Sequence, residues 1–146
     1  MPESESVYHR FILEHNRAPR HYGCPAHHDA RVRVYNPLCG DEMEVFLSWR
    51  PPGVVGRVDF AGESCAIATA SASLLTQAVE TLDRERAREL CRRFLAALAD
   101  PAAATDLPAA LAPLLEVRRF PGRLDCARLA WRALAKILDG CDTSRP

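Results

Sequence analysis

The sequence of 146 residues has no long apolar run, because no stretch approaches the roughly 20 apolar residues of a membrane-spanning helix. Its first 23 residues lack the basic start and apolar stretch of a secretory signal. An excess of charge is also absent, since 19 Lys and Arg residues balance 19 Asp and Glu residues. These absences exclude binding of nucleic acid or of a membrane surface through bulk charge, and we expect a cytoplasmic protein.

Two side-chain types are scarce in ways that limit the chemistry. Lys136 is the only lysine, so a phosphate-binding Gly-Lys-Ser/Thr loop is missing and a Schiff base would require that single residue. All five histidines lie within the first 28 residues. A metal site built further along the chain would therefore use sulfur and carboxylate ligands, unless the N-terminal segment folds back onto it. Without an export signal, the six cysteines indicate metal ligands or reactive thiols rather than disulfides.

Hydrophobic periodicity predicts a helix followed by three strands. Residues 4–15 place Val7, Tyr8, Phe11, Ile12 and His15 on one helical face. Alternating apolar residues then predict strands over 30–35, 42–49 and 54–60, the last with Val54, Val58 and Phe60 on one side. The turn Arg50-Pro51-Pro52-Gly53 joins the second and third strands as a hairpin.

The periodicity becomes helical from residue 65 onward. Helices are predicted over 65–80, 83–99 and 122–139, with short helices in 101–115 that break at Pro108 and Pro113. A strand pattern that is polar on alternate residues is typical of an antiparallel sheet with one covered face. The fold class is therefore α+β, a three-stranded antiparallel sheet with helices on one face. We expect one domain over 1–140 and a short tail over 141–146.

Three cysteines lie at the ends of predicted elements. Cys39 lies in a loop between Pro37 and Gly40, and Asp41 would point to the same side in extended geometry. Cys65 lies where a strand gives way to a helix, and a helix N-terminus favours the thiolate form. Cys126 lies in the first turns of the last helix.

The other cysteines have simpler interpretations: Cys91 continues an apolar helix face as a buried residue, and Cys24 and Cys141 lie in a loop and in the tail. Three thiolates and one carboxylate would complete a tetrahedral zinc shell, and would also suit an iron–sulfur cluster with one non-cysteine ligand. Because the sequence has no Cys-x-x-Cys pair, spacing alone leaves open that the three cysteines are isolated buried thiols.

Longer strings around these cysteines are more specific. They are HNRAPRHYG (15–23), NPLCGDEMEV (36–45), FAGESCAIATASASLLTQAV (60–79) and RLDCARLAW (123–131). Together they resemble the SufU branch of the IscU/NifU-like iron–sulfur cluster assembly family. The resemblance implies that Cys39, Asp41, Cys65 and Cys126 match the metal-site positions of that family. It also implies the family's α+β fold.

Departures from the IscU branch favour the SufU branch. Where IscU-type chains have a histidine before the third cysteine, this sequence has Asp125, and the stretch before it reads Phe120-Pro121-Gly122-Arg123-Leu124 in place of a chaperone-docking motif. The position of Arg123, three residues before Cys126, also matches the SufU pattern. Asp125 could substitute as a ligand, but a residue adjacent to Cys126 on a helix usually faces away, so Asp41 is preferred.

The resemblance implies a zinc-dependent sulfurtransferase that accepts persulfide sulfur from a PLP-dependent, SufS-like cysteine desulfurase and serves downstream iron–sulfur assembly proteins. Cys39 is the expected sulfur acceptor because its loop can swing, and Arg123 is a possible auxiliary residue; Arg128 is either a second one or simply a solvated helix residue. One alternative is a scaffold that assembles an iron–sulfur cluster on the same four residues. Another is a domain in which zinc only holds the fold.

Overall fold

A computed structural model describes residues 3–38, 40–103 and 106–142. Its sheet has three antiparallel strands in the order β1-β2-β3, namely β1 (Ala30–Asn36), β2 (Asp41–Arg50) and β3 (Val54–Ala61). The predicted strands are therefore confirmed, each extended by one or two residues. The alternating apolar side chains of β1 and β2 are buried, for example Val32 and Val45, because they face the helices.

The strand register differs from the prediction at the hairpin between β2 and β3. The pairing of β2 with β3 shifts between Ser48 and Trp49, which is a bulge. A one-residue shift exchanges the two faces of a strand beyond it. Val55 is consequently fully buried and Val54 only half-buried, so the prediction that Val54 faces the core is wrong.

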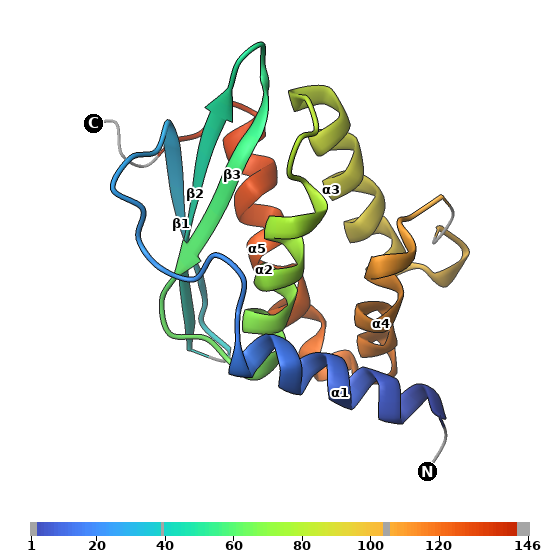
Figure 1. Ribbon diagram of the computed structural model, residues 1–146. Coiled ribbons are helices and arrows are strands. Elements are labelled where there is room, and N and C mark those ends of the chain that lie inside the picture. Colours follow the sequence, from blue (N-terminus) through green and yellow to red (C-terminus); the bar gives the residue numbers. More distant parts are fainter. Residues whose placement is uncertain (1–2, 39, 104–105, 143–146) are drawn as a thin grey trace.

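Helices cover one face of the sheet, as Figure 1 shows. The longer helices are α1 (Glu3–Arg17), α2 (Ala66–Ala78), α3 (Arg84–Ala99) and α5 (Leu124–Leu138). Helix α5 packs on β1 and β2, α2 packs beside it against β3, and α3 packs on the outer side of α5. The predicted α+β class, with a three-stranded antiparallel sheet covered on one face, is confirmed.

The segment between α3 and α5 contains short helical pieces: η1 (Pro101–Ala103), η2 (Ala109–Leu111), α4 (Ala112–Leu115), η3 (Glu116–Arg119) and η4 (Pro121–Arg123). Pro108 immediately precedes η2, as predicted. Pro113, however, lies in the first turn of α4 and does not break it. Proline is compatible with a first turn because its missing N–H has no partner there, so the predicted break at Pro113 is wrong.

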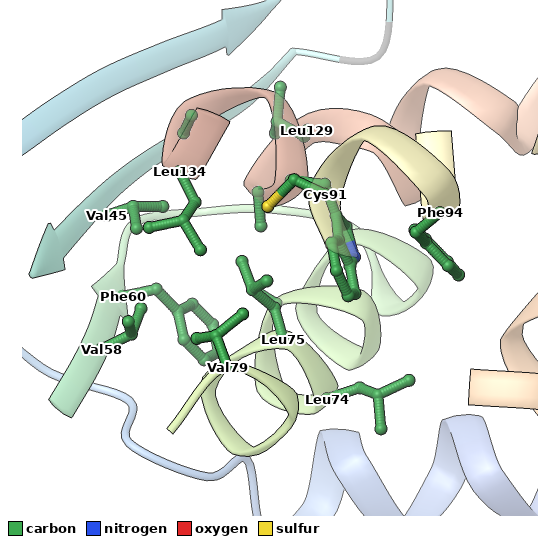
Figure 2. Close-up of a cluster of buried hydrophobic side chains, with 14 of the residues drawn as sticks. Val45, Val58, Phe60, Leu74, Leu75, Val79, Cys91, Phe94, Leu129 and Leu134 are labelled. Atoms are coloured by element: carbon green, nitrogen blue, oxygen red, sulfur yellow. The ribbon is translucent and has the colours of Figure 1, made fainter. Parts of the chain in front are cut away.

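The core lies between the sheet and the helices, where Figure 2 shows Val45 and Phe60 of the sheet facing Leu75 of α2. Cys91 of α3 points into this cluster and is fully buried, which confirms its interpretation as a core residue. The rings of Phe94 and Trp131 stack at 4.2 Å, joining α3 to α5. These contacts fix the helices whose first turns carry Cys65 and Cys126.

Helix α1 lies across the end of the molecule where α2 and α5 begin (Figure 1). Its inner face buries Tyr8 and His15, as predicted. Val7 is 46% exposed, so its predicted burial is wrong. The helical spacing places Val7 at the margin of the apolar stripe, beyond the reach of the neighbouring helices.

Candidate metal centre

Asp41 begins β2 and is held at the site by backbone geometry. It pairs across the ladder with Asn36, the last residue of β1, and is 3% exposed. Its Oδ1 accepts a hydrogen bond of 2.8 Å from the backbone N–H of Cys65. Its Oδ2 is buried and has no hydrogen-bond partner among the residues that the structure describes. Since a buried carboxylate oxygen is costly when unpaired, this atom is suited to bind a cation.

Cys65 is the N-cap of α2, in the extended conformation that a cap requires. Its Sγ accepts a hydrogen bond of 3.4 Å from the N–H of Ala68. The preceding Gly62 has φ +128 and lies against the backbone of Glu42, where a side chain would collide. Glu42 in turn donates to Glu63 O at 2.9 Å. The turn therefore holds Cys65 beside the start of β2.

Cys126 is the third residue of α5 and is fully buried. The start of α5 is tied to α2 through Ser71, whose hydroxyl donates to Ala127 O at 2.6 Å and accepts from Trp131 Nε1 at 3.0 Å. These buried bonds set the position of Cys126 relative to Cys65. The Ala/Ser run of α2 has this packing role, as its small side chains suggest.

One ligand atom from each of Asp41, Cys65 and Cys126 lies within 4.8 Å of the other two. Thiolates and a carboxylate are an ordinary zinc donor set, and sulfur also suits iron–sulfur clusters. Asp41 Oδ2, which has no hydrogen-bond partner among the described residues, and the nearby sulfur atoms of Cys65 and Cys126 fit a metal on chemical grounds. The structure thus brings together three of the four residues expected at the site, although they are far apart along the chain.

Cys39, the fourth expected ligand and the expected sulfur acceptor, lies outside the described residues. Asn36 accepts hydrogen bonds from the two residues that flank Cys39 in the sequence. Asn36 O accepts from Gly40 N at 2.8 Å, and Asn36 Oδ1 accepts from Leu38 N at 3.2 Å. Asn36 is 6% exposed and its Nδ2 is buried without a partner. A role for Asn36 in shaping this loop was foreseeable from its place before Pro37.

The two arginines considered from the sequence differ in their surroundings. Arg128 pairs with Asp125 at 3.1 Å, and Arg132 approaches the same carboxylate at 3.7 Å. The side chain of Asp125 is 45% exposed and forms ion pairs with these two arginines, which agrees with the preference for Asp41 as a ligand. Arg123 is exposed just before α5, in the segment that leads to Cys126.

The remaining cysteines lie away from the site. Cys24 and Cys141 are exposed, in a loop and after α5. Burial raises the pKa of Cys91 to about 12, so its thiol stays protonated in the core. Among the described residues, Asp41, Cys65 and Cys126 are the group of metal-ligating side chains that lie close enough to share an ion.

Comparison with known proteins identifies the family. Residues 7–113 match the model of the NifU-like N-terminal domain. The chain belongs to this family. It is 33% identical over 138 residues to the zinc-dependent sulfurtransferase SufU of Bacillus subtilis (strain 168), covering 90% of this chain and 89% of that protein. It is 31% identical over 133 residues to the iron–sulfur cluster assembly scaffold protein IscU of Streptococcus pyogenes serotype M1, covering 90% of this chain and 82% of that protein.

Solved structures of the family share the fold. The N-terminal part of a nitrogen-fixing NifU-like protein from Brucella abortus superposes with a TM-score of 0.77 at 24% identity, covering 91% of this chain and 92% of that one. The chain is therefore a member of the IscU/SufU family of iron–sulfur cluster assembly proteins. No helix in the described parts of the chain is long and apolar enough to cross a membrane.

Proposed function

We propose that this chain is a zinc-dependent sulfurtransferase, which accepts persulfide sulfur from a PLP-dependent cysteine desulfurase for iron–sulfur cluster biogenesis. The observation that carries the proposal is the convergence of Asp41, Cys65 and Cys126 within 4.8 Å, with Asp41 Oδ2 buried and unpaired. The similarity to the Bacillus subtilis sulfurtransferase supports zinc as the metal.

Asp41, Cys65 and Cys126 would hold the zinc ion, with Cys39 as the fourth ligand. Bound zinc would keep the cysteine ligands deprotonated at neutral pH and shield them from unwanted reactions. Cys65 and Cys126 belong to packed helices, whereas Cys39 follows a proline in the loop that Asn36 closes. We assign Cys39 the role of sulfur acceptor, because it is the one expected ligand that does not belong to a packed helix or to the start of a strand.

The sulfur transfer balances without an external oxidant or reductant. The Cys39 thiolate attacks the outer sulfur of the desulfurase persulfide and forms a new S–S bond. The S–S bond of the donor breaks, and the donor cysteine leaves as a thiolate. If the outer sulfur carries a proton, that proton stays on the sulfur as the sulfur is transferred to Cys39. Arg123, exposed beside the site, would stabilise the negative charge of the incoming persulfide.

The test mixes the zinc-loaded protein with a cysteine desulfurase and measures sulfide and alanine released from cysteine. We expect clear stimulation by the wild-type chain and none by Cys39→Ala. The absence of stimulation by the wild type, or equal stimulation by Cys39→Ala, would reject the proposal. If the protein refolded without metal still supports sulfur transfer, the zinc has only a structural role.

The second candidate is a scaffold for iron–sulfur cluster assembly on the same residues, favoured by the similarity to the Streptococcus pyogenes protein. Anaerobic purification followed by metal analysis separates the two. Stoichiometric zinc without visible cluster absorption supports the sulfurtransferase. Iron and acid-labile sulfide in place of zinc would support the scaffold.

A further inference from the structure

Tyr8 of α1 has a buried hydroxyl group that the proposed function does not use. The residue is 4% exposed, and its Oη has no hydrogen-bond partner in the described parts of the chain. A buried hydroxyl without a partner is unfavourable compared with a phenylalanine of the same shape. The hydroxyl therefore contributes nothing to the fold that the ring alone would not supply, and none of the described residues uses its donor.

The position of Tyr8 links this donor to the metal centre. Its ring stacks on Phe120 at 5.9 Å, and together they line a pocket of about 380 Å³ with Ile67 and Arg123. The rest of the lining comes from α1, through His9, Ile12 and Leu13. Ile67 follows Cys65 by two residues on α2, and Arg123 precedes Cys126 by three. The lining of the pocket therefore includes residues from the two segments that carry Cys65 and Cys126.

The surroundings of Tyr8 keep its hydroxyl protonated. The pKa of Tyr8 is raised to about 12, chiefly by burial, with the Arg123 guanidinium opposing this and the Cys65 thiol and Glu116 adding to it. Cys65 belongs to the candidate metal centre, and Arg123 precedes Cys126 by three residues. The hydroxyl is therefore a hydrogen-bond donor at neutral pH.

We propose that the Tyr8 hydroxyl is a sulfur-binding donor, which holds the anionic outer sulfur of the incoming persulfide next to the metal centre. This inference rests on the proposed sulfur transfer. The apolar pocket would shield the persulfide from water, and Tyr8 and Arg123 would contact its negative charge from two sides. The hydroxyl keeps its proton throughout, so the balance of the transfer step is unchanged.

The test is Tyr8→Phe, which deletes only the unpaired oxygen and keeps the ring stacked on Phe120. With a cysteine desulfurase, we expect the maximal stimulated rate to fall roughly ten- to a hundred-fold, the factor for losing a hydrogen bond to an anion. The concentration of this chain at half-maximal rate should stay the same, because the donor acts after docking. Zinc content should be unchanged, and the thermal midpoint unchanged or higher.

The matched control is Tyr35→Phe, which removes the hydroxyl of a tyrosine that is 63% exposed on β1, and we expect wild-type kinetics from it. If the wild type itself fails to stimulate the desulfurase, the proposed function is rejected. If the wild type stimulates and Tyr8→Phe does so equally, only the role of Tyr8 is rejected. Loss of zinc or of stability in Tyr8→Phe would show a structural role and would also overturn the inference.

Discussion

The backbone N–H of Cys65 donates a 2.8 Å hydrogen bond to Asp41 Oδ1, although 24 residues separate them. The bond uses one oxygen of the carboxylate and leaves Oδ2 buried and unpaired. Asp41 therefore has two separable functions. One oxygen holds the first turn of α2 against the start of β2, and the other is free to bind a metal.

Substitutions at Asp41 should separate these functions. Asp41→Asn keeps an oxygen that can accept from Cys65 N–H but removes the charge, so we expect a preserved fold and weaker zinc binding. Asp41→Ala also leaves the part-buried N–H unpaired, which should lower the free energy of unfolding by about a further 1–3 kcal/mol. Zinc titration against a competing chelator and urea denaturation measure the two effects. Wild-type zinc affinity in Asp41→Asn would show that Asp41 is not a ligand.

Zinc should change the reactivity of one group of cysteines and not of the others. We expect alkylation of Cys65 to slow strongly when zinc is bound, because the metal occupies the sulfur lone pairs. Exposed Cys24 and Cys141 should react equally with and without zinc. Cys91 should remain unmodified until the protein unfolds, since burial raises the pKa of its thiol to about 12. Peptide mass spectrometry reports each site, and a zinc-independent rate at Cys65 would count against the metal centre.

Ser71 should contribute to stability through its buried bonds to α5. In Ser71→Ala, the indole N–H of Trp131 loses its acceptor, and we expect the free energy of unfolding to fall by about 1–3 kcal/mol. Ser48→Ala removes a half-buried serine bond to His27 O on the sheet, and should change stability by less than about 0.5 kcal/mol. Urea denaturation of both variants checks the difference. Equal changes in the free energy of unfolding for Ser71→Ala and Ser48→Ala would mean that the bonds of Ser71 between α2 and α5 do not stabilise the protein.

His15 should make the protein less stable in mild acid. Burial lowers the pKa of His15, the Arg20 guanidinium acts in the same direction, and Glu14 opposes them. Because the unfolded chain then binds the proton more readily, the stability is fully present above the unfolded pKa of 6.5 and is lost as pH falls toward the folded pKa. Its Nδ1 lies 2.7 Å from Ser73 Oγ, in a buried contact.

The measurement is the free energy of unfolding between about pH 7 and pH 5. His15→Gln should show a smaller decrease over this interval than the wild type. The exposed His9 provides a control for the deletion of a histidine, His9→Gln, against which the effect of His15→Gln is compared. Parallel slopes in the wild type and His15→Gln would exclude His15 as the source of the acid sensitivity.

Periodicity predicted every strand and long helix, because burial of one face imposes a repeat on the sequence. It failed at Val54 and Val55, because the register shift opposite Ser48 and Trp49 leaves Gly56 of β3 as an extra, unpaired residue, and simple alternation takes no account of a glycine bulge. It also failed at Pro113, where the residue that breaks a helix interior is tolerated in a first turn. These errors concern local geometry that a linear pattern does not encode.

From the sequence, the residue types of the candidate site and their positions at the ends of predicted elements could be recognised, but their distances from one another could not. Cys65 and Cys126 stand at helix starts in the sequence, but their proximity to Asp41 depends on how α2 and α5 pack. The unpaired polar atoms of Asn36 and Tyr8 were not foreseeable. Tyr8 simply continues an apolar stripe, and only its surroundings in three dimensions distinguish its hydroxyl from an ordinary core tyrosine.

Because α2 and α5 contact each other directly and Ser71 joins them by hydrogen bonds, the spacing of Cys65 and Cys126 is set by this packing and not by the length of the chain between α3 and α5. That connection contributes Leu111, Leu114 and Val117 to the core, so an inserted reporter belongs at its exposed positions, Ala109 and Ala110. The same independence explains why counting residues from one cysteine to the next is a poor guide to this kind of site.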